Sequence, residues 1–233
     1  MSRPTEPQAP NAKTMTTRAP VLIVDDHPLV REGLGARISA QPDMRVCGEA
    51  AGVDEALALL DTTAPELVIV DLALKDGHGL NLIKKVMQRA PTTKILVVSA
   101  YDDALFAERA LRAGALGYIN KQEAQHNVVE ALRTVLRGGC YLSAEMTRRL
   151  VKHTAGRKSE LRGIEGLSDR GLEVFEQIGR GKSTRSIAQH LHLSIHTIES
   201  YRENIRDKLA LRDGAELVQQ AVQWVLEMRS TRS

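Results

Sequence analysis

Short apolar runs rich in β-branched residues recur along the first half of the chain, and they constrain its fold more than any other feature. The strongest runs are residues 21–24, 67–70 and 95–98, and weaker versions lie at 45–49 and 116–119. A short strand without a polar face is buried on both sides, which is typical of a parallel sheet. Between the runs, apolar residues recur at helical spacing over 28–40, 54–61, 80–89, 104–113 and 125–137.

Strands that alternate with helices predict an α/β domain. We expect residues 19–140 to form a doubly wound, five-stranded parallel sheet with helices on both faces. The strand pattern is absent after residue 139, where residues 143–153 predict one helix and residues 167–228 predict four short helices. We therefore expect a small all-α domain over 166–230. Residues 141–165 are expected to be a linker helix and a flexible linker, and the proline-rich residues 1–18 a disordered tail.

The composition predicts a cytoplasmic globular protein with no membrane contact. Hydrophobic residues make up 42% and charged residues 26%, which excludes disorder throughout. No apolar run approaches the ~20 residues of a membrane helix, and the start of the chain lacks a secretory apolar segment. The charge is uneven, with 13 Lys/Arg against 16 Asp/Glu over 19–140 and 16 against 12 after residue 140. The basic second part is a weak indication of nucleic-acid binding.

Polar residues follow the predicted strands at the points where the strands end. The first strand is followed by Asp25 and Asp26, the third by Asp71, the fourth by Ser99 and Ala100, and the fifth by Lys121. Because ligands bind beyond the carboxyl ends of parallel strands, we expect these side chains to meet at one edge. An acidic residue at the end of a strand can simply cap the next helix. That explanation suffices for a single aspartate, but it does not explain why five polar residues all lie at strand ends.

The chemistry of this edge suits Mg²⁺ and a phosphoryl group. Three crowded carboxylates need a cation, and an all-oxygen site is the kind that Mg²⁺ prefers. Lys121 supplies a compact positive charge and Ser99 a hydrogen bond to a phosphate, and Ala100 is small enough to let the phosphoryl group approach. The pattern predicts phosphoryl transfer to a carboxylate.

These residues resemble the receiver domain of two-component response regulators. The matching motifs are Val-Asp25-Asp26-His27, Val-Asp71-Leu, Val-Val-Ser99-Ala and Gly114-Ala-Leu-Gly-Tyr118-Ile-Asn-Lys121, within residues 19–140. The resemblance implies a flavodoxin-like fold, Asp71 as phospho-acceptor, and Mg²⁺ held by Asp25, Asp26, Asp71 and the backbone carbonyl of Ala73. It also implies that Lys121 contacts the phosphate and that Ser99 and Tyr118 move together on activation.

Two expectations accompany this resemblance. We expect Tyr118 to turn inward and fill the space that Ser99 leaves when phosphorylation draws it away. The loop after Asp71 departs from the family, because Lys75 stands where receivers usually have proline, and its glycines at 77 and 79 are interpreted as turn formers.

The second domain shows the pattern of a helix-turn-helix. Ser168 is a plausible N-cap for its first helix. After a turn at residues 192–194, a helix follows with Ile198, Tyr201, Ile205 and Leu209 as its buried stripe. In such a motif the second helix enters the major groove of DNA, whereas an isolated polar helix face is usually only solvated.

The motifs Leu-Ser-x-Arg, Gly-Lys-Ser-Thr-x-x-Ile-Ala-x-x-Leu, Ser-x-x-Thr-Ile and Asn-Ile-x-x-Lys-Leu resemble the LuxR-type DNA-binding domain over 165–229. A receiver followed by this domain resembles the NarL/FixJ subfamily. Departures are Gly171 for a usual Glu, His192 for a common Gly, Glu199 for a common basic residue and Tyr201 for a common His. The expected DNA-contacting residues are Lys182, Thr184, Ser194, His196, Thr197, Glu199, Ser200, Arg202, Glu203, Arg206 and Lys208.

The sequence thus predicts a phosphorylation-dependent transcription regulator rather than an enzyme, apart from catalysing its own phosphoryl transfer and dephosphorylation at Asp71. A sensor histidine kinase would supply the phosphoryl group, and the phosphorylated homodimer would bind double-stranded promoter DNA. Two alternatives remain open. One is a Mg²⁺-dependent phosphohydrolase, although Ala73 stands where such enzymes have a second aspartate. The other is a DNA-binding regulator whose receiver only dimerises.

Overall fold

The structure is a computed structural model that describes residues 18–74, 77–101, 104–155 and 163–230. Nearly all of the predicted tail, Lys75 and most of the predicted flexible linker lie outside these residues. Within them, no helix is both long enough and apolar enough to cross a bilayer.

A parallel sheet forms the centre of the first domain, with strand order β2-β1-β3-β6-β7-β8. Its strands are β1 (Ala19–Val24), β2 (Met44–Ala50), β3 (Leu67–Val70), β6 (Lys94–Ser99), β7 (Gly117–Asn120) and β8 (Tyr141–Leu142). The prediction of five strands was wrong by one, because β8 adds a sixth at the edge, where the backbone N–H of Tyr141 donates to Leu116 O at 3.0 Å. Two residues are too few to show a strand pattern in the sequence.

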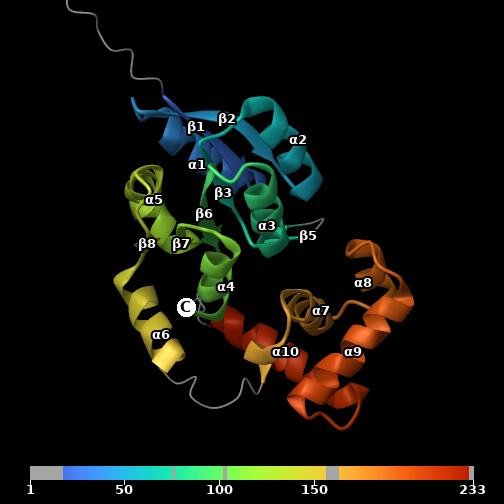
Figure 1. Cartoon of the computed structure of the whole chain (residues 1–233). Helices are drawn as coiled ribbons and strands as arrows, with labels where there is room; N and C mark the ends of the chain where they lie inside the picture. Colours follow the sequence, from blue (N-terminus) through green and yellow to red (C-terminus); the bar gives the residue numbers. More distant parts are fainter. Residues whose placement is uncertain (1–17, 75–76, 102–103, 156–162, 231–233) are drawn as a thin grey trace, which may run out of the picture.

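Helices cover both faces of the sheet, as the wholly apolar strands predict (Figure 1). Alternate residues of β1 point to opposite faces, so Val21 and Ile23 join one core cluster and Leu22 and Val24 the other. The first cluster includes side chains of α1 (Pro28–Ser39) and α5 (Lys121–Leu136). The second includes side chains of α2 (Val53–Thr63), α3 (Gly79–Arg89) and α4 (Ala104–Ala113).

The segment after β3 forms a small antiparallel pair, β4 (Ala73–Leu74) with β5 (Gly77–His78), which the sequence did not indicate. Gly77 follows the connection between these two strands, whose residues 75 and 76 lie outside the described part of the chain, and neither Gly77 nor Gly79 has a positive φ. Gly79 is instead placed by close packing, since a Cβ there would lie 2.2 Å from the carbonyl oxygen of Asp71. The backbone N–H of Gly79 also donates to Leu72 O at 2.9 Å.

The remaining helices are α6 (Ala144–Ala155), a short 3₁₀ turn (Ile164–Gly166), α7 (Asp169–Gly179), α8 (Thr184–His190), α9 (Ile195–Leu209) and α10 (Gly214–Ser230). The prediction of one helix near 143–153 followed by four short helices is confirmed. Serine caps begin several of them: Ser143 Oγ accepts from Met146 N, Ser168 Oγ from Gly171 N, and Ser194 Oγ from Thr197 N. Buried Met146 lies in α6, which packs against α4 of the first domain.

We expect Gly79→Ala to destabilise the protein by roughly 1–3 kcal/mol, because the added methyl group must displace backbone beside Asp71. Gly33→Ala is the matched control, since nothing lies within 4 Å of a Cβ at this helix-interior glycine. That control should be neutral or stabilising by up to about 1 kcal/mol, owing to the better helix propensity of alanine. Urea unfolding measures both, and equal effects would show that the close approach at Gly79 is unimportant.

Candidate functional site

Three carboxylates converge at the carboxyl edge of the sheet. Asp25 and Asp26 follow β1 and Asp71 follows the adjacent strand β3, so the parallel register places them side by side. Ligand atoms of these residues and His27 all lie within 4.8 Å of one another. Asp25 and Asp71 are each 1% exposed, so this is a buried acidic cluster.

Lys121 neutralises part of this cluster. It is the first residue of α5, directly after β7, and its Nζ lies 2.7 Å from Asp71 Oδ2 and 2.7 Å from Asp25 Oδ2. The other oxygen of Asp71, Oδ1, accepts from the backbone N–H of Ala73 at 3.3 Å. The ammonium therefore bridges two carboxylates that would otherwise repel each other in a buried site.

Burial decides the protonation of the cluster. It raises the pKa of Asp71 to about 6, against the opposing charge of Lys121 and with a further rise from the nearby Asp25. Burial alone would lower the pKa of Lys121, but the carboxylates of Asp71 and Asp25 raise it overall. At neutral pH Asp71 is therefore mostly ionised.

The donor set suits a hard divalent cation. Asp25 Oδ2 and Asp26 Oδ1 are buried and accept no well-directed hydrogen bond. Lys121 Nζ lies 2.7 Å from Asp25 Oδ2, and His27 Nδ1 lies 2.7 Å from Asp26 Oδ1. Carboxylate oxygens with unused lone pairs are the ligands that Mg²⁺ takes. The clustered site can thus hold a metal ion at Asp25, Asp26 and Asp71.

The residues after β6 are organised around Tyr101, which the sequence analysis did not single out. Ser99 is fully buried, and its Oγ accepts from the backbone N–H of Tyr101 at 3.1 Å, while Ala100 beside it is half-buried. Tyr118 is 1% exposed, and its hydroxyl donates to the carbonyl of Tyr101 at 2.7 Å. Tyr118 therefore already lies inward in this structure, where the Tyr101 carbonyl offers the phenol a buried partner.

Helices α8 and α9 form the predicted helix-turn-helix. His192 has a φ of 53°, the left-handed conformation that the tight turn needs, and Leu193 N donates to Ala188 O at 2.9 Å to close it. Ile198 and Ile205 of α9 are buried and Tyr201 and Leu209 half-buried, so the predicted stripe packs inward.

The expected DNA-contacting residues lie at the surface of this domain. The exposed ones are Ser194, His196, Glu199, Ser200, Glu203 and Lys208, and the half-buried ones are Lys182, Thr184, Thr197, Arg202 and Arg206. Two of the cations are already constrained. Partial burial and the charge of Arg180 lower the pKa of Lys182, and Lys208 Nζ donates to Gly166 O at 3.0 Å.

We expect Asp71→Asn to stabilise the protein at pH 7 by roughly 2–3 kcal/mol without Mg²⁺, because the folded carboxyl has a pKa of about 6 against 3.8 when unfolded. In the unfolded chain Asp71 loses its proton at a lower pH than in the folded protein. The free energy of unfolding of the unmodified protein therefore falls as the pH rises from 3.8 to about 6. The advantage of the variant should therefore vanish near pH 4. Urea unfolding at several pH values tests this, with Asp61→Asn, whose side chain is 62% exposed, as control. A pH-independent difference would contradict it.

Both halves of the chain match known families. Residues 21–133 match the family described as response regulator receiver domain, and residues 165–221 match the one described as bacterial regulatory proteins, luxR family. The chain is 34% identical over 208 residues to the oxygen regulatory protein NreC of Staphylococcus carnosus, covering 87% of this chain and 96% of that protein.

Solved structures agree with this assignment. RcsB of Salmonella enterica serovar Typhimurium, bound to the promoter rprA in the presence of the phosphomimetic BeF3⁻, is 26% identical with a TM-score of 0.67, covering 87% of this chain and 98% of that one. A LuxR-family two-component response regulator from Aurantimonas sp. SI85-9A1 is 31% identical with a TM-score of 0.57, covering 60% of this chain and 99% of that one. The chain belongs to the NarL/FixJ subfamily of response regulators, the phosphorylation-dependent transcription regulators of two-component systems.

Proposed function

We propose that Asp71 is the phospho-acceptor of this regulator. The observation that carries the assignment is the position of Lys121 Nζ, 2.7 Å from both Asp71 Oδ2 and Asp25 Oδ2. A carboxylate oxygen of Asp71 forms the new bond to phosphorus as the bond between phosphorus and the donor breaks. The ammonium of Lys121 then follows the added negative charge from the carboxylate to the phosphoryl oxygens.

Asp25 and Asp26 would hold Mg²⁺ together with Asp71 and the backbone carbonyl of Ala73. When bound, the ion shields the charge between the carboxylates and the incoming phosphoryl group. Asp25 accepts from the backbone N–H of His27 at 2.8 Å, which fixes the carboxylate that Lys121 shares with Asp71. Ser99 and Ala100 provide a hydroxyl and a small side chain on the β6 side, and the same site would later catalyse dephosphorylation.

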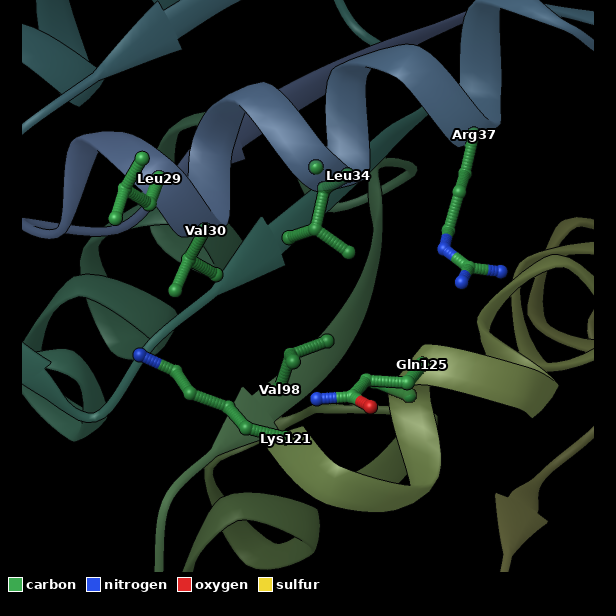
Figure 2. A pocket seen from close by; sticks show the side chains of 9 residues that line it. Leu29, Val30, Leu34, Arg37, Val98, Lys121 and Gln125 are labelled. Carbon is green, nitrogen blue, oxygen red and sulfur yellow. The ribbon is translucent and has the colours of Figure 1, made fainter.

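The face beside this site suits a helical partner, the sensor histidine kinase. A cavity of about 350 Å³ lies between α1 and α5 and opens next to Lys121. Figure 2 shows Leu29, Val30 and Leu34 on α1 above the cavity, with Lys121 and Gln125 of α5 below it. Leu29 is 81% exposed, so an apolar side chain stands uncovered where a partner must approach to reach Asp71.

The second domain would read promoter DNA through α9. Its polar face presents Glu199, Ser200 and Glu203 to bases, where a carboxylate can accept from cytosine N4. Lys182, Arg202, Arg206 and Lys208, with the N-terminus of α9 at Ser194, would mainly contact phosphates.

A homodimer formed on phosphorylation would read two half-sites about one helical turn apart, so the target should be pseudo-palindromic. Leu226 and Val218 of α10 are 55% and 40% exposed, which supports a contact between copies along this helix. We place this regulator in the cytoplasm, where promoter DNA lies.

We expect incubation with a small-molecule phosphodonor and Mg²⁺ to add one phosphoryl group, detected by intact mass, and Asp71→Asn to abolish the gain. Asp61→Asn, at an exposed carboxylate of α2, is the matched control and should be labelled normally. Unchanged labelling of Asp71→Asn would reject the acceptor. Continuous release of phosphate without accumulated mass would favour the phosphohydrolase, and no labelling of the folded protein would favour a receiver that only dimerises.

For DNA, we expect Arg206→Ala to weaken binding to cognate and scrambled sequences alike and to reduce the salt slope by about 1. Glu199→Ala should instead weaken the preference for one base at a single position of the site, by roughly 1–3 kcal/mol of binding free energy. Arg89→Ala, at a half-exposed arginine of α3 in the receiver, is the control and should change neither. If Glu199→Ala tightens binding equally on every sequence, Glu199 is only a repulsive charge.

A further inference from the structure

The first residue of α9, Ile195, is an apolar side chain at the surface of the expected recognition helix. It is 49% exposed, and the structure describes α9 throughout. The other exposed residues of this helix are polar: His196, Glu199, Ser200, Glu203, Asn204, Asp207 and Lys208. The fully buried residues that α9 contributes to the core are Ile198 and Ile205. Burial in the folded domain therefore does not explain an isoleucine at position 195.

The start of the helix does not favour an isoleucine either. A β-branched residue has a lower helix propensity than alanine, leucine or glutamate. An acidic residue would stabilise the first turn through the helix dipole, but the first turn of α9 contains none. The helix is instead capped by Ser194, whose Oγ accepts from Thr197 N at 3.0 Å. A capped helix start without negative charge suits an approach to DNA phosphates.

Ile195 lies in line with the two carboxylates that we assign to base contacts. Residues four positions apart are neighbours on a helix surface, so Ile195, Glu199 and Glu203 form one row along α9. All three are exposed. Figure 1 shows α9 next to α8, at the side of the second domain that lies away from the sheet. In a helix-turn-helix, base edges are contacted by the N-terminal residues of the second helix, and Ile195 is the residue of the row nearest that end.

We propose that Ile195 packs against the C5-methyl group of a thymine in the major groove. This inference rests on the proposed function, because it requires α9 to read DNA. Of the four bases, only thymine presents a methyl group in the major groove, so an apolar side chain can distinguish it from the others. The contact removes two apolar groups from water, which is favourable without any charge or hydrogen bond.

The geometry of the helix predicts where this thymine lies. Four residues span about 6 Å along α9, at ~1.5 Å per residue, and successive bases are ~3.4 Å apart along one strand. The thymine should therefore lie about one or two base pairs from the base that Glu199 contacts. Since Glu199 would accept from cytosine N4, each half-site should contain a cytosine and a thymine at neighbouring positions.

Deoxyuridine in place of thymine tests the contact, because it lacks only the methyl group. The full chain, with Mg²⁺ and beryllofluoride as the phosphoryl mimic, is first used to select its preferred sequence from randomised duplexes. Each thymine of that sequence is then replaced in turn, and binding is measured by fluorescence anisotropy. Replacement at the predicted position of one half-site should weaken binding by the unmodified chain roughly 4-fold, as expected from the loss of one buried methyl group.

Ile195→Ala should lose most of this preference for thymine over deoxyuridine, because only its Cβ remains to face the methyl group. Alanine has the higher helix propensity, so α9 should stay folded, which circular dichroism verifies. The salt slope of binding should equal that of the unmodified chain, because no charge is lost. Val151→Ala, at a 64% exposed apolar residue of α6, is the matched control and should keep the roughly 4-fold preference.

Failure of this inference can be told apart from failure of the proposed function. The contact is overturned if no deoxyuridine replacement weakens binding, or if Ile195→Ala retains the full preference for thymine. It is also overturned if Ile195→Ala weakens binding to every duplex equally while the preference remains. In these cases, tighter binding of the selected duplex than of a scrambled one leaves the reading of DNA by α9 intact. If the unmodified chain binds all duplexes alike, the proposed function fails and the contact fails with it.

Discussion

The ammonium of Lys121, held between two buried carboxylates, is the interaction on which the acidic edge depends. Asp71 and Asp25 are almost fully buried, and buried charges persist only when they are paired. Lys121 can reach both because β7 ends directly before it and the parallel register brings β1, β3, β6 and β7 to the same edge. The sheet thus sets both the position of Asp71 and the position of the charge that favours its ionised form.

Much of this arrangement is visible in the sequence because it depends on local patterns. Wholly apolar strands predict a parallel sheet, and a parallel sheet forces residues such as Asp25, Asp71 and Lys121 to one edge. The start of α7 could also be predicted from the sequence, since Ser168, the expected N-cap, accepts from Gly171 N. His192 stands where the resembled family commonly has Gly, and the structure gives it a positive φ of 53°.

What the sequence did not show depends on contacts between distant segments. Tyr101 and Glu176 look like ordinary loop and helix residues until the two domains are packed together. The need for glycine at position 79 comes from the backbone of Asp71, eight residues away, rather than from its own turn. Similarly, the inward Tyr118 follows from one carbonyl, that of Tyr101, whose direction no pattern of residue types reveals.

The two faces of α7 have a consequence for how this protein can change over generations. Leu172, Phe175 and Ile178 are buried in the hydrophobic core, whereas Glu173 and Glu176 pair with Arg170 and Arg180 of their own domain and also contact the receiver. A DNA-binding domain transferred to a different receiver would keep the pairs of Glu173 with Arg170 and of Glu176 with Arg180, but it would lose the contacts with Asn81 and Tyr101. The domains are therefore separate modules in sequence, and a substitution at Tyr101 or Glu176 alters a contact that involves the other domain.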